Sequence, residues 1–104
     1  MKIGTDIVHI SRFKNIDEFA LKKIFYPSEL RNKEPLHLAG LFAAKECCKK
    51  IFPNSNWLDF EVKKQKNGKP VIHTKNGFKG DVSISHDGEY AIAVVISEDN
   101  TKNK

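Results

Sequence analysis

The first third of the chain combines one strand-like segment with a weakly helical one. Residues 2–10 are rich in isoleucine, valine and threonine and predict a buried first strand. Ser11 is placed to cap the next segment, in which apolar residues between Phe13 and Ile24 recur at roughly helical spacing. The break at Tyr26-Pro27 then predicts that a short helical turn restarts near residue 28.

The strongest helical pattern begins at Glu34-Pro35 and ends at Pro53-Asn54. Proline is well tolerated in the first turn of a helix and unfavourable beyond its last turn. Glu46 and Lys50 are four residues apart within this helix, so they share one face. An apolar stripe is expected along the helix at Leu36, Ala39, Gly40, Phe42, Ala43, Cys47 and Ile51.

The second half of the chain predicts a meander of four strands at residues 57–64, 69–74, 81–86 and 89–97. Asn67-Gly68 predicts a type I′ hairpin turn, Asp87-Gly88 a second tight turn, and Asn76-Gly77 a looser connection. The run from Tyr90 to Ile96 is apolar on both faces and predicts a central strand. One strand, then helices, then a meander indicates an α+β fold in a single domain over residues 1–104.

Composition narrows the classes of function. The chain has 18 Lys and Arg against 13 Asp and Glu, a formal net charge of +5. This excess indicates an anionic partner or substrate, although a solvated basic surface explains it equally well. A chain of 104 residues leaves little room for a deep private pocket, which favours a site shared between subunits.

Cysteine usage and hydropathy indicate an intracellular protein. Cys47 and Cys48 are adjacent in the predicted helix, where they cannot form an ordinary disulfide with one another, so we expect them to be reduced. No signal-peptide pattern is present, and no apolar run approaches the roughly 20 residues that span a bilayer. A cytoplasmic location is therefore expected.

Four side chains could together support phosphoryl transfer. Asp6 and Glu46 are hard oxygen ligands, Lys50 supplies an ammonium group, and His86 supplies an imidazole. Each also has an ordinary explanation: Asp6 bonded to an amide or a lysine, Glu46 and Lys50 as a helix-surface pair, His86 bonded to a turn. The other histidines have no metal-ligand spacing and are expected at the surface or its boundary: His9, His37 and His73.

Several classes are excluded by the motifs that the sequence lacks. It contains no Gly-rich phosphate loop, no zinc knuckle and no serine in a nucleophile elbow. The basic run Lys63-Lys64-Gln65-Lys66 could follow a nucleic-acid backbone, but it has no interleaved aromatic residues. We therefore expect it to be the solvated edge of a hairpin.

Four strings, taken in order, resemble the holo-acyl-carrier-protein synthase family of 4′-phosphopantetheinyl transferases, in its short trimeric type. They are Gly4-Thr5-Asp6-Ile7-Val8, Leu38-Ala39-Gly40-Leu41-Phe42-Ala43-Ala44-Lys45-Glu46 with Lys50, Asn67-Gly68-Lys69-Pro70, and Ser83-Ile84-Ser85-His86 with Tyr90-Ala91. The resemblance covers nearly the whole chain. It implies the family's fold and transfer of 4′-phosphopantetheine from coenzyme A to a serine of apo acyl carrier protein, with release of adenosine 3′,5′-bisphosphate, in support of fatty acid biosynthesis.

The resemblance also implies roles for individual residues. Asp6 and Glu46 would hold Mg²⁺, and Lys50 would stabilise charge on the bridging and leaving oxygens. Asp6 or Glu46 acting through a water is preferred to His86 as the general base. Residues implied to line the coenzyme A site are Phe42, Lys50, Asn67, Gly68, Lys69, Pro70, Ser85 and His86, with Lys23 near the nucleotide phosphate.

The partners are implied by the same resemblance. An acidic acyl carrier protein would dock on a basic surface of the first helical segment, formed by Arg12 with Lys14 and Lys22. Relatives of this short type form homotrimers with sites between protomers. Neither a membrane nor a nucleic acid is expected as a partner.

Three positions depart from the family's pattern. Leu41 stands where many relatives have Arg, so one nucleotide-phosphate contact is either absent or supplied by another lysine. His9 replaces a residue that is often acidic, and Phe52-Pro53-Asn54-Ser55 replaces a glycine-containing loop. The lysine excess and the Leu41 departure keep a second hypothesis open: a non-catalytic basic binding module, either a degenerate relative or a nucleic-acid binder.

Overall fold

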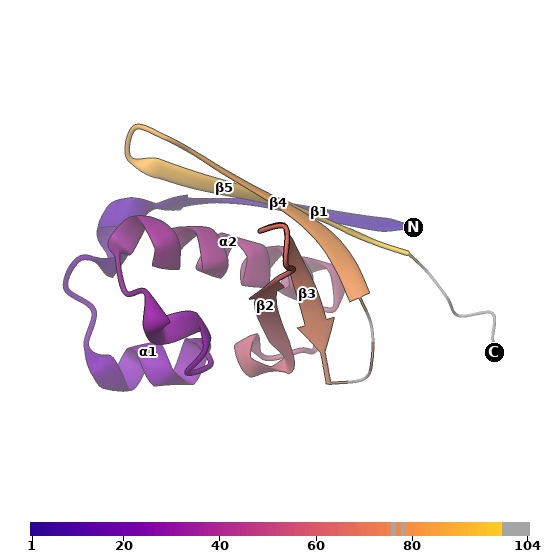
Figure 1. Cartoon of the computed structure of the whole chain (residues 1–104), viewed down its shortest axis with the longest axis horizontal. Helices are drawn as coiled ribbons and strands as arrows, with labels where there is room; N and C mark the ends of the chain where they lie inside the picture. The colour runs from indigo at the N-terminus through magenta and orange to yellow at the C-terminus, as the bar shows by residue number, and fades with distance from the viewer. Residues whose placement is uncertain (76, 78, 99–104) are drawn as a thin grey trace.

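Five antiparallel strands form one sheet, and helices cover one of its faces (Figure 1). The computed structural model describes residues 1–75, 77 and 79–98. The strand order across the sheet is β1 (Lys2–His9), β5 (Tyr90–Ser97), β4 (Lys79–Asp87), β3 (Pro70–Thr74) and β2 (Phe60–Lys64). This arrangement confirms the predicted α+β fold.

The long helix α2 (Pro35–Ile51) runs lengthwise along the sheet, and α1 (Glu18–Ile24) lies beyond it, farther from the strands (Figure 1). Three single-turn 3₁₀ helices complete the chain: η1 (Ile10–Phe13), η2 (Glu29–Arg31) and η3 (Trp57–Asp59). No helix in the described part of the chain is long and apolar enough to cross a bilayer.

Helix α2 begins and ends where the sequence predicts. Pro35 occupies the first helical position, and Lys49 and Lys50 in the last turn lie near the negative end of the helix dipole, where cations are favoured. Leu36 is 45% exposed, so the buried stripe begins later than predicted. The face toward the sheet is built largely of small, fully buried residues: Ala39, Ala43, Ala44, Cys47 and Cys48. The two cysteines are free thiols, as expected.

The small residues let α2 approach the sheet most closely at Gly4. A Cβ atom built on Gly4 would lie 2.6 Å from the carbonyl oxygen of Cys47, a distance that real Cβ atoms do not adopt. Because residues two apart in a strand share a face, Asp6 and Val8 face the same side as Gly4. The Cys47 thiol also donates a hydrogen bond to the Ala93 carbonyl on β5, at 3.3 Å. Strand β1 therefore presents Asp6 to the C-terminal half of α2.

We expect Gly4→Ala to lower the free energy of unfolding by about 1–3 kcal/mol, because an overpacked site must shift its backbone. The atom in the way at Gly4 belongs to the Cys47 backbone. At Gly40 an added Cβ would meet side chains rather than backbone, those of Ile84 at 2.9 Å and His86 at 3.4 Å, and side chains can shift more easily. Urea denaturation of Gly4→Ala and Gly40→Ala compares the two. Equal costs would show that backbone contact at Gly4 does not control the packing of α2 on β1.

An aromatic cluster joins the helical layer together. The Phe13 ring lies 5.3 Å from that of Phe42 and 6.0 Å from that of Phe25, and Phe42 lies 6.0 Å from Trp57. Such pairs contribute about 0.5–1.5 kcal/mol each beyond the area they bury. The cluster fixes η1 and η3 against the middle of α2.

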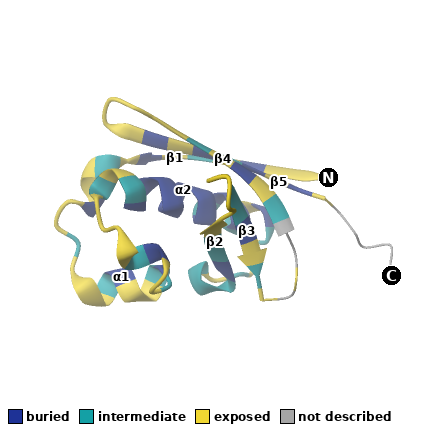
Figure 2. Cartoon of the chain, viewed as in Figure 1, coloured by how far each residue is buried: buried dark blue, intermediate teal, exposed yellow. Residues whose placement is uncertain are grey.

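Strand β1 is an edge strand with one open face, which corrects the prediction of a buried first strand. Ile3 and Ile7 are 68% and 60% exposed, and they pair across the sheet with Ile96 and Ile92 of β5. Strand β5 lies between β1 and β4, so the predicted central position is confirmed. None of the helices in the described part of the chain covers this side of the sheet (Figure 2). We call it the outer face, and its large apolar residues are Ile3, Ile7, Tyr90, Ile92 and Ile96.

The local predictions before α2 are partly wrong. Ser11 makes no capping bond; the Asp17 carboxylate caps α1 instead, accepting from the Ala20 amide at 2.8 Å. The predicted helical stretch therefore splits into η1 and α1. The expected turn near Ser28 is confirmed as η2.

The hairpins differ from prediction in their turn types. Gly68 has a φ of 87° but Asn67 has no positive φ, so the β2–β3 turn is not type I′. Residues 66–68 form a three-residue loop between Gln65 and Lys69. The Gln65 amide donates to the Lys69 carbonyl and the Gly68 amide donates to the Gln65 carbonyl, each at 2.9 Å. The β4–β5 turn lies at Gly88-Glu89, one residue later than predicted.

Three further predictions concern the strands of the meander and their connections. The first of these strands begins only at Phe60, because residues 57–59 form η3. Strand β2 is the other edge of the sheet, and its lysines Lys63 and Lys64 are exposed, as expected for a solvated hairpin edge. Of the looser connection predicted at Asn76-Gly77, Asn76 lies outside the described residues.

Candidate functional site

Asp6 and Lys50 form the first pair of the site. The Lys50 Nζ atom lies 3.2 Å from Asp6 Oδ1 and donates to the Thr5 carbonyl at 2.8 Å. The Asp6 side chain is 17% exposed and that of Lys50 is 56% exposed. The charge inside β1 is therefore compensated by a lysine. Because the lysine is half open to solvent, this pair contributes little to stability.

Glu46 lies one turn before Lys50 and has a different partner. Its Oε2 atom accepts a hydrogen bond from the indole Nε1 of Trp57, at 2.7 Å. The surface pair between Glu46 and Lys50 is not found among the ion pairs of the described residues, since Lys50 pairs with Asp6. Sequence reasoning missed Trp57, and the only available signal was that it is the single tryptophan in the chain.

The charges of both carboxylates, Asp6 and Glu46, affect the pKa of one thiol in α2, that of Cys47. Burial raises the pKa of the Cys47 thiol to about 12, and the charges of Asp6 and Glu46 add to this effect while Lys50 opposes it. Glu46 directly precedes Cys47 in α2, and Asp6 is held beside the last turn of α2 by its ion pair with Lys50. The two carboxylates, 40 residues apart in the sequence, therefore both lie along the C-terminal half of this helix.

This donor set fits Mg²⁺. The ion prefers oxygen ligands, uses one or two carboxylates, and keeps waters or phosphate oxygens in the rest of its octahedral shell. Asp6 and Glu46 provide the carboxylates, and Lys50 provides a cation for a neighbouring phosphate. Among the described residues, no three His, Cys, Asp or Glu side chains are grouped as a metal cluster.

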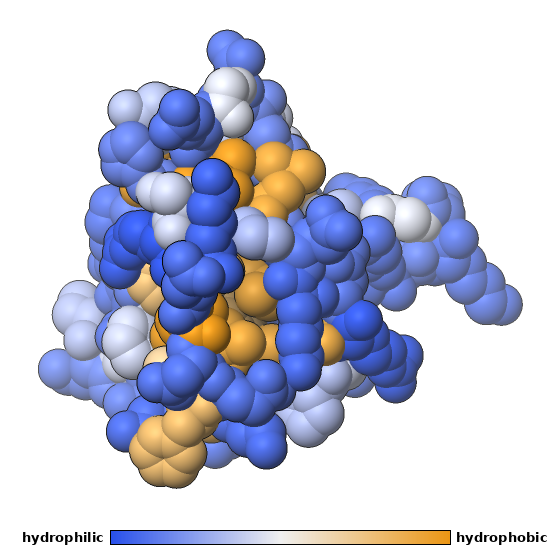
Figure 3. Space-filling model, turned by 90° about the vertical axis from the view of Figure 1, so that its left-hand side faces the viewer, coloured by the Kyte–Doolittle hydropathy of each residue, from blue (hydrophilic) through white to orange (hydrophobic). Residues whose placement is uncertain are grey.

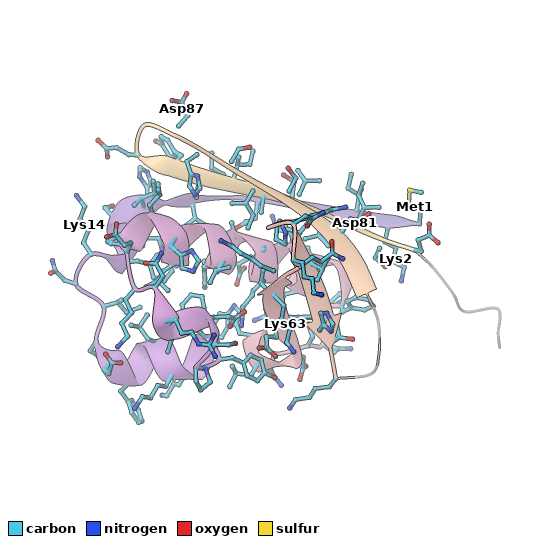
Figure 4. The ribbon with its side chains drawn as sticks, viewed as in Figure 1. Met1, Lys2, Lys14, Lys63, Asp81 and Asp87 are labelled. Carbon is cyan, nitrogen blue, oxygen red and sulfur yellow. The ribbon has the colours of Figure 1, made fainter. Side chains whose placement is uncertain are left out.

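A second group of predicted site residues surrounds a cavity of about 650 Å³ beside the N-terminal half of α2. Pro70 and His86 line it together with Gly40. A Cβ atom on Gly40 would lie 3.4 Å from His86 Nε2, so α2 and β4 are in close contact there. Basic side chains from three elements also line the cavity: Arg31, His37, Lys63 and Lys64. Lys63 projects from β2 in Figure 4.

Within one chain the two groups lie on different sides of α2. Gly40 and Glu46 are six residues apart, which corresponds to a rise of about 9 Å and a rotation of about 240°. The structure therefore pairs Asp6 with Lys50, one turn after Glu46, and places all three away from the cavity that Pro70 and His86 line. The tip of the β2–β3 hairpin, residues 67–69, is exposed next to Pro70.

Two predicted coenzyme A residues have unexpected surroundings. Ser85 and His86 are neighbours in β4 and so point to opposite faces of the sheet. Ser85 pairs with Ile92 and lies on the outer face. Phe42 is only 5% exposed and packs in the aromatic cluster, so little of its ring is available to a ligand in the single chain.

The predicted basic surface lies at the end of the molecule formed by η1 and α1. The Arg12 guanidinium lies 5.1 Å from the centre of the Phe42 ring, and the same ring packs against Trp57. Lys14 projects from this end in Figure 4, and Lys22 is exposed in the last turn of α1. Figure 3 views this end, where hydrophilic residues surround a smaller apolar area. The Lys23 ammonium lies over the Phe19 ring, at 4.7 Å.

A buried ion pair next to the site was not predicted. The side chains of Lys45 and Glu29 are fully buried, with Lys45 Nζ 2.7 Å from Glu29 Oε1. Lys45 also donates to the carbonyls of Ile24 and Trp57, while Glu29 accepts the amides of Tyr26 and Val62. Burial lowers the pKa of Lys45, and the charge of Glu29 opposes that effect. The pair joins η2, β2 and η3 to α2 beside Glu46.

The shifted pKa of His37, which lines the cavity, should make the stability of the fold depend on pH. Burial lowers its pKa below 6.5, and the nearby charge of Lys64 acts in the same direction. The unfolded chain therefore takes up a proton near about pH 6.5, before the folded chain does, so stability should fall as the pH falls through this window. His37→Gln should remove this slope. Urea midpoints between about pH 7.5 and about pH 5, with exposed His73→Gln as the control, test this; equal slopes for wild type and His37→Gln would contradict it.

The sequence is similar to known proteins over most of its length. Residues 2–95 match the sequence model of the 4′-phosphopantetheinyl transferase superfamily. Holo-[acyl-carrier-protein] synthase of Nautilia profundicola is 43% identical over 109 residues, covering 90% of this chain and 96% of the relative. The enzyme of the same name from Caldicellulosiruptor saccharolyticus is 36% identical over 116 residues, covering 92% and 94%.

Solved structures give the same result. The crystal structure of Helicobacter pylori holo-[acyl-carrier-protein] synthase in complex with coenzyme A superposes with a TM-score of 0.81 at 33% identity, covering 93% of this chain and all of that one. The Bacillus anthracis synthase, in complex with CoA (3′,5′-ADP), gives a TM-score of 0.80 at 30% identity, covering 92% and 94%. Sequence and fold agree, and the chain belongs to the 4′-phosphopantetheinyl transferase superfamily.

Proposed function

We propose that this protein transfers 4′-phosphopantetheine from coenzyme A to a serine of apo acyl carrier protein, yielding the holo form and adenosine 3′,5′-bisphosphate. The observation that carries this proposal is the ion pair of Asp6 with Lys50, one helical turn after Glu46, in a chain that matches holo-[acyl-carrier-protein] synthases along nearly its whole length. We place the reaction in the cytoplasm, in support of fatty acid biosynthesis, and in a single domain of residues 1–104.

The residues have distinct roles in this reaction. Asp6 and Glu46 would hold Mg²⁺, which when bound would offset charge on the pyrophosphate. The serine oxygen forms a new bond to the phosphorus that bears pantetheine, and the bond from that phosphorus to the departing bisphosphate breaks. Lys50, beside Asp6, stabilises the charge that develops on the departing oxygen. We propose that the serine proton passes through a water to Asp6 or Glu46 rather than to His86.

We propose that the complete coenzyme A site forms between protomers of a homotrimer. Two observations support this assembly. Asp6, Glu46 and Lys50 lie on a different side of α2 from the His86 cavity, so one chain does not bring the two groups together. The outer face also exposes large apolar residues that a neighbouring chain would cover (Figure 2). The coenzyme would contact Phe42, Lys50, Asn67, Gly68, Lys69, Pro70, Ser85 and His86, with Lys23 near the nucleotide phosphate.

The acyl carrier protein would approach from the end that carries Arg12, Lys14 and Lys22. These side chains are exposed, and Arg12 is linked to Glu46 through Phe42 and Trp57. A negatively charged partner would be attracted by the formal charge of +5. Exposed charges of this kind speed encounter more than they strengthen final binding.

Intact-protein mass spectrometry tests the proposed transfer. Apo acyl carrier protein should gain the mass of phosphopantetheine when the purified protein, coenzyme A and Mg²⁺ are all present, and should gain none when a chelator removes the metal. No mass gain with several carrier proteins would contradict the proposal. Salt-dependent binding to polyanions without a metal requirement would favour the non-catalytic basic module instead.

A further inference from the structure

We propose that Trp57 is a positioning residue: its indole N–H holds one oxygen of Glu46 and so fixes the direction in which the carboxylate meets a divalent cation. This inference rests on the proposed function and assigns one more residue to the same site. The bond is short, with Trp57 Nε1 2.7 Å from Glu46 Oε2. Hydrogen bonds to an ionised carboxylate are among the stronger ones in proteins.

The indole group suits this role chemically. It is a donor only and does not ionise in the physiological range, so it competes for no proton and carries no charge that would repel a cation. It occupies one oxygen of Glu46 and leaves the second oxygen for another ligand. The ammonium group of Lys50 is paired with Asp6 and not with Glu46.

The Trp57 side chain is itself held in place. Lys49 Nζ lies 4.0 Å from the ring centre, and the Phe42 ring lies 6.0 Å away. The backbone is fixed by a capping box of Asn56 and Asp59, in which the Asn56 amide donates to Asp59 Oδ2 at 2.9 Å. The donor that reaches Glu46 is therefore anchored on its ring and at its backbone.

Helix α2 also holds the backbone of Trp57, through the residue next to Glu46. Lys45 precedes Glu46, and its buried ammonium donates to the Trp57 carbonyl at 3.4 Å. Adjacent residues of one helix thus bind the backbone and the ring of Trp57. A packing role alone would require only an aromatic ring at this position, whereas the bond to Glu46 requires the N–H group.

Removal of the N–H group should weaken cation binding while sparing the reaction at saturating metal. Groups that orient a metal ligand in this way typically change metal affinity about tenfold or more. Because Trp57 is the only tryptophan, feeding benzothienylalanine in its place changes one ring nitrogen to sulfur and keeps the shape. The probe is Mn²⁺ added with coenzyme A to the full chain, with free Mn²⁺ measured by electron paramagnetic resonance.

We expect the wild type to bind Mn²⁺, and both the benzothienyl protein and Trp57→Phe to bind it about tenfold more weakly. In the transfer assay the KM for Mg²⁺ should rise to a similar extent, with kcat little changed. Ile72→Val, a packing change in the buried core, is the control and should alter neither constant. Unchanged Mn²⁺ affinity in the benzothienyl protein would overturn this inference alone. A wild type that binds no Mn²⁺ would overturn it together with the metal role proposed for Asp6 and Glu46.

Discussion

Glu46→Gln should lower the rate of phosphopantetheine transfer by about a thousandfold, because loss of a metal ligand removes several kcal/mol of charge stabilisation and each 1.4 kcal/mol is tenfold in rate. The substitution keeps the size of the side chain and removes only its charge. Fold and packing should survive, because Glu46 is only partly buried and its carboxylate bonds to the Trp57 indole at one oxygen.

Single-turnover transfer at saturating coenzyme A, followed by mass spectrometry, measures this effect. Glu89→Gln makes the same chemical change in the exposed β4–β5 turn and should transfer at the wild-type rate. Raising Mg²⁺ should not restore Glu46→Gln fully, because the ligand itself is missing. Transfer by Glu46→Gln at the full rate would refute the role given to this carboxylate.

Lys45→Met should cost about 3–5 kcal/mol of unfolding free energy, because it leaves the Glu29 carboxylate buried without its cation. Methionine fills a similar volume, so lost packing contributes less than lost charge. The two amides that Glu29 accepts, from Tyr26 and Val62, compensate only part of the charge. A loss of this size is a large fraction of the stability of a small domain.

The chain contains a matched control for this prediction. Lys33 and Glu18 are also 2.7 Å apart, but their side chains are 50% and 56% exposed. Lys33→Met should therefore change the urea midpoint little, since exposed pairs are screened by solvent. The double variant Lys45→Met with Glu29→Gln should recover part of the loss, because no unpaired buried charge remains. Equal losses for the two lysine variants would show that burial does not set the strength of these pairs.

The sequence predicts the layers of this fold well, because their signals are local. Pro35 and the apolar spacing after it define α2, and alternation with glycine-containing turns defines the meander. Sequence alone does not predict which strand becomes an edge. The isoleucines of β1 look buried by composition, whereas the register with β5 places two of them on the outer face.

The site was predictable only in part, for a related reason. Asp6, Glu46 and Lys50 could be proposed together from motif resemblance, and the close packing of α2 on β1 at Gly4 explains why Asp6 reaches Lys50. Trp57 lies in a single-turn helix, which has no periodic pattern to mark it. Its partner Glu46 is 11 residues away and meets it only after the chain has turned at the end of α2.

The Lys45–Glu29 pair shows the same limit. Lys45 lies among small residues of α2, and nothing in the local sequence indicates that its partner is Glu29, 16 residues earlier in η2. Charged residues are almost never fully buried unless they are paired, so composition favours an exposed position for both. Only the folded arrangement of η2 against α2 reveals the pair.

The two adjacent thiols of α2 have a consequence for an enzyme that handles a thiol-bearing substrate. Both are buried, and burial raises the pKa of each to about 12. Thiol–disulfide exchange requires an accessible thiolate. Burial and the raised pKa values therefore both disfavour a mixed disulfide between oxidised coenzyme A and either thiol of the folded protein.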